Sequence, residues 1–378
     1  MSERKIRKIV FITNNFLVGG VERLIYDLIS YLDKEKFDIS IITVMGSGPW
    51  EKHYQELGVP IYYAGPTQTY QDNWKFKLMW LIMLPRTLWR IWRWLRQNLP
   101  QTILTSLYHA DIIGIWMGYW VGIKNRLVIQ HDIHDLAPLL RYAKQFLAIK
   151  LATRVIAVSK TAREFSINYF RATPDQVVVI SNALVSKKFN QSWRTMPQSG
   201  LVLGFLGRLE SIKGPQILLE TLCLLQNQHN LQPKAVIGGE GSLKDQLVDK
   251  AQHCQLAHTQ FSGNVVDSAE WLRQIDILVV PSLSEGFCLS ALEGLVAKKI
   301  VVASDLPAIR ELIQDENNGL LFEPQNSQGL ASELYRLLTD PELQQKINQN
   351  VLLWHTQHAA EYDIKHLVDK YEQLLLET

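Results

Sequence analysis

KIVFIT at residues 8–13 is an apolar run of strand length, followed by Gly19-Gly20 and the amphipathic segment VERLIYDLISYL at residues 21–32. A second apolar run, FDISIITV at residues 37–44, predicts another strand. Strand, helix and strand in this order indicate a parallel sheet covered by helices. Further strands are predicted at residues 102–107, 127–129, 155–158 and 177–180. We therefore predict one doubly wound α/β domain over residues 1–185.

The same pattern restarts after a polar segment at residues 186–200, which is predicted to be a linker. LVLGFL at residues 201–206 predicts a new strand, and a helix is predicted from Pro215. A second α/β domain is therefore expected over residues 201–355. The segment 356–378 carries apolar residues spaced for one buried helix face, and we expect it to pack back on the first domain. Ligands of such domains bind at the carboxyl ends of the strands, so a central cleft between the two domains is expected.

Composition indicates an ordinary folded protein, because 47% of the 378 residues are hydrophobic and 20% are charged. The apolar stretch at residues 9–12 is shorter than a signal peptide requires, and no apolar run approaches the roughly 18 residues of a membrane span. Cys223, Cys254 and Cys288 show no CxxC spacing. We therefore predict a cytoplasmic protein in a reducing compartment, without a disulfide framework or a cysteine zinc site.

Charge is distributed unevenly along the chain, although the net charge is only +2. Divided after Val185, the first part carries 23 Lys and Arg against 14 Asp and Glu, and the second part carries 16 against 23. The first part therefore suits an anionic partner such as nucleic acid or anionic lipid. The alternative is that these charges serve solubility alone.

The loop after residues 201–206 combines glycines with two cations. It reads GRLESIKG at residues 207–214, and Pro215 suits the first position of a helix. The amino end of that helix, the Arg208 guanidinium and the Lys213 ammonium together could neutralise a diphosphate. A tight turn with two solvated cations is the alternative.

Two carboxylates follow the apolar run at residues 276–280, in the segment SLSEGFCLSALE at residues 282–293. On one continuous helix Glu285 and Glu293 would differ by about 80° in direction and about 12 Å in rise. That separation exceeds the roughly 5 to 9.5 Å of a hydrolytic carboxylate pair. We expect them instead to accept hydrogen bonds from hydroxyls at two ends of one elongated ligand. For Glu293 the alternative is an exposed helix position, although its neighbours are apolar.

These motifs resemble the donor domain of the retaining GT-B glycosyltransferases of family four. Besides residues 207–214 and 281–294, the resemblance rests on GGEG at residues 238–241, FSGNV at 261–265 and NNGLLFEP at 317–324. The first half matches through VGGVERLIYDL, RLVIQHD, RVIAVSKTARE and VVVISNAL. The resemblance implies an α/β fold of the GT-B type, with two Rossmann-like doubly wound domains facing a central cleft.

The resemblance implies that Arg208 and Lys213 hold the diphosphate of a UDP- or GDP-sugar, that Glu293 binds the ribose and that Glu285 addresses the donor sugar. Backbone groups at residues 263–265 would contact the nucleobase. The donor-binding set it implies is Gly19, Gly20, Gly207, Arg208, Lys213, Gly263, Asn264, Val265, Glu285, Gly286, Phe287, Cys288, Leu289 and Glu293. The catalytic set it implies is His131, Arg208, Lys213 and Glu285.

His131 follows a predicted strand, so we expect its imidazole to point into the cleft. It matches the family's cleft histidine, and between charged substrates it would titrate near physiological pH. A core histidine bonded to a backbone carbonyl is the alternative. A metal site with Asp132, His134 and Asp135 is disfavoured, because residues at strand spacing alternate in direction. No metal is therefore expected.

A basic segment rich in tryptophan spans residues 73–110, which contain no acidic residue and five of the eleven tryptophans. On a helix, Arg86, Arg90 and Arg93 would share one side, with Trp89 and Trp94 near its boundaries. Cations beside indole rings are typical of an anionic membrane surface or an acceptor contact. A sheet-covering helix whose arginines stack on its own tryptophans is the alternative. Single-stranded nucleic acid is disfavoured because no binding motif accompanies the segment.

The sequence therefore predicts a retaining hexosyl- or N-acetylhexosaminyltransferase at the inner membrane face, without a cofactor. Its acceptor is expected to be a saccharide or a lipid-linked acceptor in surface polysaccharide or glycolipid biosynthesis. The first domain offers no evident carboxylate nucleophile, so we expect a same-face displacement assisted by the leaving phosphate. A non-catalytic protein that binds sugar nucleotide or membrane, and a GT-B sugar-nucleotide epimerase, are the alternatives.

Overall fold

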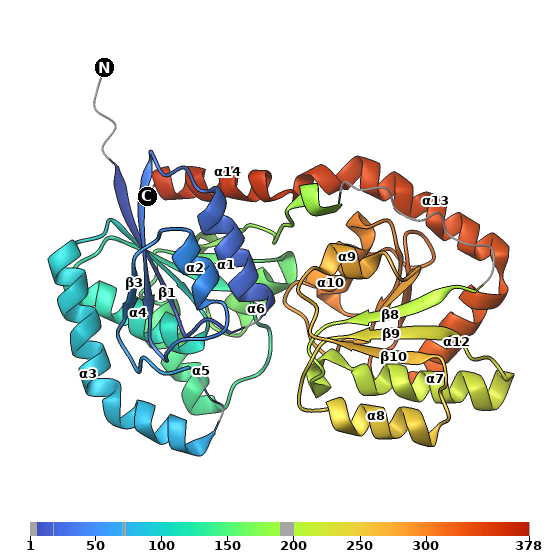
Figure 1. Ribbon diagram of the computed structural model, residues 1–378. Coiled ribbons are helices and arrows are strands. Elements are labelled where there is room, and N and C mark those ends of the chain that lie inside the picture. The colour runs from blue at the N-terminus through green and yellow to red at the C-terminus, as the bar shows by residue number, and fades with distance from the viewer. Residues whose placement is uncertain (1–5, 18, 70, 72, 190–199, 378) are drawn as a thin grey trace. The chain divides into compact units, whose positions relative to one another are not determined.

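The computed structural model describes residues 6–17, 19–69, 71, 73–189 and 200–377. The chain divides into two compact units, one of residues 1–183 with 364–378 and one of residues 184–363 (Figure 1). Each unit contains one parallel sheet with helices packed against it. Two predicted α/β domains with parallel sheets are thereby confirmed.

The first unit holds a seven-stranded sheet in the order β3-β2-β1-β4-β5-β6-β7. Its strands are β1 (Arg7–Thr13), β2 (Phe37–Thr43), β3 (Ile61–Tyr63), β4 (Thr102–Ser106), β5 (Asn125–Gln130), β6 (Arg154–Ala157) and β7 (Val177–Val179). The central strands are buried along most of their length, which explains their continuous apolar sequence. In register, Ile9 of β1 lies opposite Ile39 of β2.

Helices of this unit are α1 (Gly20–Tyr31), α2 (Glu51–Glu56), α3 (Trp74–Asn98), α4 (Tyr108–Val121), α5 (Pro138–Lys144), α6 (Lys160–Asn168) and α14 (Ile364–Glu377), with a π-helical turn, η1, at Gln145–Ile149. The last of them, α14, packs against α1. Arg7 at the start of β1 donates to the carbonyl oxygens of Leu375 and Leu376 at 2.6 and 2.7 Å. Residues far apart in sequence thus complete one domain.

The second unit holds a six-stranded sheet in the order β10-β9-β8-β11-β12-β13. Its strands are β8 (Val202–Leu206), β9 (Lys234–Gly238), β10 (Thr259–Gly263), β11 (Ile277–Val280), β12 (Ile300–Ser304) and β13 (Leu320–Phe322). Its α-helices are α7 (Pro215–His229), α8 (Lys244–His253), α9 (Ser268–Leu272), α10 (Leu289–Val296), α11 (Pro307–Arg310), α12 (Ser327–Thr339) and α13 (Pro341–His358). In Figure 1, α7 and α8 lie on one side of this sheet and α9 and α10 on the other.

The divisions between the units differ in detail from the predicted boundaries at 185, 200 and 355. The structure divides the chain after Ala183 and after Asp363, and α13 continues through position 355. Leu184 N donates to Tyr362 O at 2.8 Å, which joins the two ends of the second unit. Most of the predicted linker, residues 190–199, lies outside the described residues.

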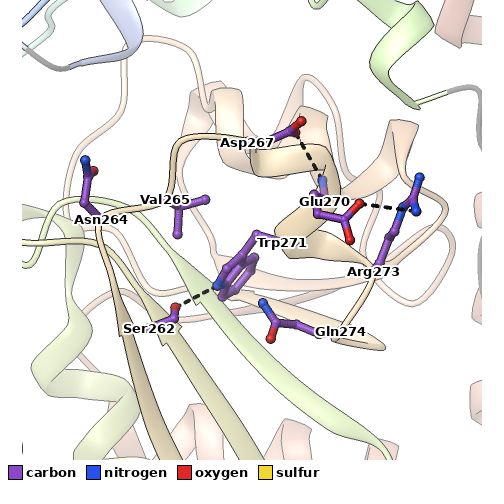
Figure 2. A pocket seen from close by; sticks show the side chains of 8 residues that line it. All are labelled: Ser262, Asn264, Val265, Asp267, Glu270, Trp271, Arg273 and Gln274. Carbon is purple, nitrogen blue, oxygen red and sulfur yellow. Dashed lines mark hydrogen bonds and ion pairs between the residues drawn. The ribbon is translucent and has the colours of Figure 1, made fainter.

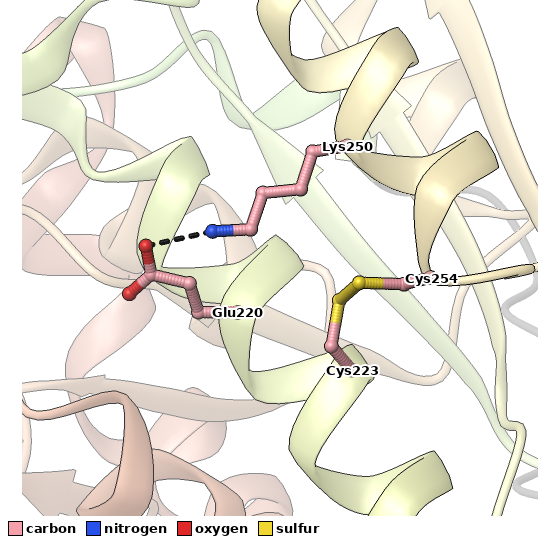
Figure 3. The surroundings of a disulfide bond; sticks show 4 residues. All are labelled: Glu220, Cys223, Lys250 and Cys254. Carbon is pink, nitrogen blue, oxygen red and sulfur yellow. Dashed lines mark hydrogen bonds and ion pairs between the residues drawn. A yellow bond between two sulfur atoms is a disulfide. The ribbon is translucent and has the colours of Figure 1, made fainter.

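A disulfide joins Cys223 to Cys254, so the prediction of no disulfide was wrong. The two cysteines are 31 residues apart in sequence, but α7 packs against α8 and brings their Cα atoms within 5.6 Å. Figure 3 shows the bond beside an ion pair of 2.8 Å between Lys250 and Glu220, which joins the same two helices. Cys288 is a buried free thiol.

Each sheet has a point at which the chain order reverses. In the first sheet it lies between β1 and β4, and in the second between β8 and β11. Open α/β sheets bind their ligands at the carboxyl ends of such strands. Within the residues that the structure describes, no helix combines the length and the apolar character that crossing a bilayer requires.

Candidate functional site

The loops after β8 and β11 lie against each other at the switch point of the second sheet. Gly214 has a φ of +70°, and a Cβ atom there would lie 1.9 Å from the carbonyl oxygen of Pro281. Leu283 N donates to Ile212 O at 2.8 Å. Only glycine allows this approach, which fixes the two loops side by side.

Lys213 and Glu285, predicted from separate motifs, meet between these loops. Lys213 Nζ donates to Glu285 Oε1 at 2.7 Å, and Ser282 Oγ donates to the same oxygen at 2.7 Å. Glu285 is buried and Lys213 is half-buried, while Arg208 in the first loop is exposed. The loop after β8 therefore offers one accessible guanidinium and one cation that a buried carboxylate already holds in position.

Glu293 has a different set of neighbours. It is buried on α10 and accepts a hydrogen bond of 2.6 Å from Ser268 Oγ on α9. Because α10 begins at Leu289, Glu285 precedes the helix, and the predicted geometry of two carboxylates on one continuous helix does not apply. The two carboxylates nevertheless have separate partners, as expected for residues that do not act as one hydrolytic pair.

The segment from Gly286 to Leu289 leads into the amino end of α10. No side chain caps this end, and the first backbone N–H groups of a helix have no partner within the helix. Phe287 and Cys288 are buried, and burial raises the pKa of the Cys288 thiol to about 12. Cys288 is therefore a packed thiol at neutral pH, and the segment can contribute backbone donors to a ligand.

An open pocket of about 540 Å³ lies beside the carboxyl end of β10 and includes Asn264 and Val265 (Figure 2). The Trp271 indole is part of its lining and donates from Nε1 to Ser262 Oγ at 2.9 Å. Arg208, Lys213 and Glu285 are not among its lining residues. Gly263, with a φ of +69°, turns the chain from β10 into this pocket.

In the first unit, His131 follows β5 and is 8% exposed. The pKa of His131 is lowered to about 4, chiefly by burial; the Asp132 carboxylate opposes this shift, and the Lys144 cation adds to it. In the protein alone the imidazole is therefore neutral at physiological pH, while the expectation for His131 between two charged substrates stays a prediction. Its Nε2 atom is buried and has no hydrogen-bond partner among the described residues, unlike a core histidine bonded to a carbonyl.

We expect the buried His131 to make stability depend on pH. Because the pKa is lower in the folded state than the ordinary value near 6.5, the unfolded state takes up the proton first as pH falls. The free energy of unfolding should therefore decrease by about 2 kcal/mol between pH 7 and pH 5. Urea unfolding of wild type and His131→Gln at both pH values measures this, and an equal loss in both proteins would contradict it.

The buried charges next to His131 escaped the sequence analysis. Lys144 Nζ lies 3.0 Å from Asp111 Oδ2, with both side chains nearly inaccessible, and Thr105 Oγ1 donates to Asp111 Oδ1 at 2.8 Å. In the described part of the chain, no group of three or more His, Cys, Asp or Glu side chains is arranged to hold a metal ion.

The glycine pair stands at the beginning of α1. Gly19 caps the helix with an extended φ of −164°, and Gly20 is the first helical residue. A Cβ atom on Gly19 would meet the movable end of the Glu22 side chain at 2.5 Å. Within this unit, a residue with a side chain could therefore replace Gly19, because its φ is ordinary and the Glu22 side chain can move aside.

Both parts of the chain match known protein families. Residues 187–354 match the family described as "Glycosyl transferases group 1", and residues 18–185 match "Glycosyltransferase Family 4". The chain belongs to these glycosyltransferase families. The match over residues 187–354 contains the β8 and β11 loops, and it begins and ends close to the limits of the second unit.

Two curated members of the group show the extent of the similarity. The chain is 30% identical over 215 residues to a glycosyltransferase of Methanocaldococcus jannaschii, covering 53% of this chain and 54% of the relative. It is 24% identical over 249 residues to a D-inositol 3-phosphate glycosyltransferase of Streptomyces bingchenggensis, covering 60% and 53%. The chain thus spans about half the length of the curated relatives it matches.

Similarity to solved structures shows that this glycosyltransferase has the GT-B fold. Anabaena HepE, whose crystal structure contains UDP and glucose, superimposes with a TM-score of 0.81 at 19% identity, covering 98% of this chain and 100% of HepE. The similarity extends over both units.

The basic, tryptophan-rich segment of this family member forms α3, whose buried side consists of Phe76, Thr87, Ile91 and Leu95. Arg86, Trp89 and Arg93 are exposed, whereas Trp94 is half-buried and packs against the core, 6.2 Å from the Tyr62 ring. Arg90 is half-buried as well.

The cations of α3 also contact aromatic rings. The Arg90 guanidinium lies over Tyr62, and that of Arg93 over Trp89, each at 5.3 Å. Arg90 is thus less exposed than Arg86 and Arg93, because Tyr62 of β3 provides it with an aromatic partner. Arg93 does stack on a tryptophan of its own helix, as the alternative of a sheet-covering helix describes, but it is also exposed.

The sequence analysis missed a second apolar stripe on α3. Its members share a spacing of three or four residues and face away from the core: Trp74, Leu78, Leu81, Ile82, Pro85, Trp89 and Trp92. Trp74 is 69% exposed and Ile82 is 72% exposed. The spacing was readable in the sequence, but a helix with two apolar stripes does not reveal which of them is buried.

Proposed function

We propose that the protein is a glycosyltransferase that moves a sugar from a nucleotide-diphospho-sugar to a saccharide or lipid-linked acceptor. The observation that carries this proposal is the Lys213–Glu285 pair of 2.7 Å at the switch point of the second sheet, with the exposed Arg208 in the same loop as Lys213. Membership of the glycosyltransferase families supports it. Because the HepE structure contains UDP and glucose, we propose UDP-glucose as the first donor to test, ahead of GDP-sugars.

Each donor-site residue then has a role set by its surroundings. Arg208 and Lys213 stabilise the negative charge that develops on the leaving diphosphate. Lys213 has three N–H donors, so it can keep its bond to Glu285 and still donate to a phosphate oxygen. Glu285 accepts from a hydroxyl of the donor sugar, and Glu293 from the ribose.

The remaining contacts are proposed to be with backbone. Residues 263–265 contact the nucleobase at the pocket beside β10, and N–H groups of residues 286–289 contact the phosphate or sugar at the amino end of α10. Gly207, Gly19 and Gly20 allow close approach of the donor phosphate. With two cations opposite the diphosphate, the transfer needs no metal ion, and we propose that it retains the anomeric configuration.

Donor binding is expected to depend on the two cations. UDP should raise the Tm of wild type, because a ligand at 100 times its Kd stabilises the native state by about 2.7 kcal/mol. The double variant Arg208→Ala/Lys213→Ala should lose this shift. A panel of UDP, GDP, ADP and their glucose conjugates in a thermal-shift assay measures it.

The matched control is Lys244→Ala/Arg336→Ala, which removes one Lys and one Arg from exposed ion pairs of the same unit. It should keep the shift. Absence of stabilisation by every nucleotide would contradict the donor site. Stabilisation without transfer to any acceptor would favour a non-catalytic sugar-nucleotide-binding protein, and an altered sugar on the nucleotide would favour an epimerase.

We also propose that the protein contacts an anionic membrane surface at the cytoplasmic face through α3, consistent with a role in surface polysaccharide or glycolipid assembly. The specific observation is the exposed apolar stripe from Trp74 to Trp92 together with the exposed Arg86 and Arg93. Apolar side chains and indoles would enter the headgroup region while the cations meet anionic lipids.

Membrane contact should depend on the stripe. Leu78→Ser/Ile82→Ser should reduce cosedimentation with phosphatidylglycerol vesicles about tenfold or more, because each apolar CH₂ group contributes about 0.8 kcal/mol. Leu352→Ser/Leu353→Ser on α13, which changes two other exposed leucines, should have no effect. Equal binding of both variants, or equal binding of wild type to phosphatidylcholine vesicles, would contradict the proposal.

A further inference from the structure

A disulfide cross-links a part of the second unit that no proposed step of the transfer uses. It joins Cys223, in the middle of α7, to Cys254, the residue that follows α8. The segment between the two cysteines contains β9, the loop at residues 239–243 and α8 itself. The bond therefore ties the end of α8 covalently to α7 and closes this segment into a loop.

The two cysteines differ in their access to solvent. Cys254 is half-buried, and its neighbours His253 and Gln255 are exposed. Cys223 is only 9% exposed and belongs to the buried side of α7. Thiol–disulfide exchange requires access to the sulfur that is attacked. A thiolate from solution should therefore attack the Cys254 sulfur, with Cys223 as the leaving group.

Other contacts hold the two helices together without the bond. Lys250 Nζ lies 2.8 Å from Glu220 Oε1, about one turn before each cysteine (Figure 3). Glu220 Oε2 also accepts a hydrogen bond of 3.0 Å from Ser327 Oγ on α12. On α8, Leu247 and Ala251 are buried. We therefore expect α8 to stay folded against α7 after reduction, so that the bond can form again.

The cross-linked segment also holds the loop that carries Arg208. Leu209 N donates to Glu240 O at 2.9 Å, and Leu243 N donates to Leu209 O at 3.0 Å. A Cβ atom on Gly241 would lie 2.4 Å from the same Leu209 oxygen, so the two loops approach closely. Arg208 directly precedes Leu209. A change in the mobility of α8 can therefore reach the donor site through the loop at residues 239–243.

We propose that the Cys223–Cys254 bond is a redox modification site, which dithiols reduce, and that its reduction weakens nucleotide binding. With the bond broken, α8 and the loop at residues 239–243 are less restrained, so a nucleotide must order them at a greater cost in conformational entropy. The effect on nucleotide binding rests on the proposed function, whereas the redox site itself does not.

The reduction moves two electrons from the dithiol to the protein. A thiolate of the dithiol attacks the Cys254 sulfur, so that a mixed disulfide forms and the bond to Cys223 breaks. Cys223 leaves as a thiolate and takes up a proton. The second thiol of the dithiol then attacks its own sulfur in the mixed disulfide, which forms the cyclic disulfide of the dithiol and releases Cys254 as a thiol. Glutathione disulfide restores the bond by the reverse exchange and is itself reduced to two molecules of glutathione.

Counting thiols tests the modification site. The full-length protein is treated with glutathione disulfide, and one half is then incubated with dithiothreitol under native conditions. Both halves are alkylated in urea and weighed by mass spectrometry. One alkyl group, on Cys288, is expected before reduction and three after it. Three groups before reduction, or only one after it, would overturn the proposal.

Calorimetry with UDP tests the effect on nucleotide binding. The reduced protein should bind UDP about fivefold more weakly than the oxidised protein, which is the lower end of typical couplings between two sites. Its Tm should be about 5 to 10 °C lower, and the backbone amides of α8 should exchange hydrogen faster. Equal UDP affinity of the two forms would overturn the coupling.

The variant Cys223→Ser/Cys254→Ser is the control. It should match the reduced wild type in UDP affinity and should not respond to dithiothreitol, and a response equal to that of wild type would overturn the assignment to this bond. If UDP binds neither form of the wild type, the donor proposal fails and the coupling fails with it, while the thiol count still decides the redox site.

Discussion

Glu285→Ala is expected to lower kcat for sugar transfer by about 10²- to 10³-fold, the range seen when one preorganised polar group is removed from an active site. The buried carboxylate contacts both Lys213 Nζ and Ser282 Oγ at 2.7 Å, so its loss removes a proposed sugar contact and frees Lys213 from its position. Lys213 remains half-buried and can be solvated, so the fold should persist.

Initial rates of transfer from UDP-glucose, with Tm as a check on folding, measure this effect. Glu240→Ala provides the control, because Glu240 forms an exposed ion pair with Lys244 in the same unit. UDP binding by Glu285→Ala should stay within a few-fold of wild type. Transfer at near-normal rate would remove Glu285 from the proposed catalytic set.

Gly214→Ala is expected to lower the free energy of unfolding by about 2 to 5 kcal/mol, combining the cost of a Cβ atom at positive φ with a forced backbone shift. The new Cβ would lie 1.9 Å from the backbone oxygen of Pro281, which cannot rotate away as a side chain can. The loops carrying Lys213 and Glu285 would have to separate, so the UDP-induced Tm shift should also decline.

Urea unfolding followed by circular dichroism measures the loss. Gly207→Ala, seven positions earlier, serves as the stability control, because a Cβ atom there would approach Phe205 no closer than 3.6 Å. Its free energy of unfolding should change by less than about 1 kcal/mol. Similar values for the two variants would show that the contact between the loops is not tight.

The sequence predicted the two α/β domains because long apolar runs alternate with helical periodicity, and the parallel sheets confirm this. Lys213 and Glu285 were predicted as parts of one ligand site, although 72 residues separate them. The rule that joins them is geometric: adjacent parallel strands present their following loops at one edge. Ser282, which also donates to Glu285, could have been predicted by the same rule, because it follows the buried strand β11 by two positions.

Features that depend on side-chain burial were beyond prediction. The low pKa of His131 results from desolvation, and the Lys144–Asp111 pair and the Cys223–Cys254 bond result from the packing of helices whose residues are 33 and 31 positions apart in sequence. None of these has a local periodicity. The half-burial of Arg90 and Trp94 could not be predicted for a related reason, because their partner Tyr62 lies on the short strand β3, which the sequence analysis did not predict.

The first unit is built from two separate segments of the chain, and this affects its folding during synthesis on the ribosome. Its strands are complete by Val179, but α14 follows only after residues 184–363, which at 5 to 20 residues per second takes on the order of 10 to 40 s. During that time the surface of α1 that α14 later contacts is uncovered, and Arg7 lacks the carbonyl oxygens of Leu375 and Leu376. During synthesis the first unit therefore remains incomplete until α14 has been made, whereas the second unit can fold before α14 appears.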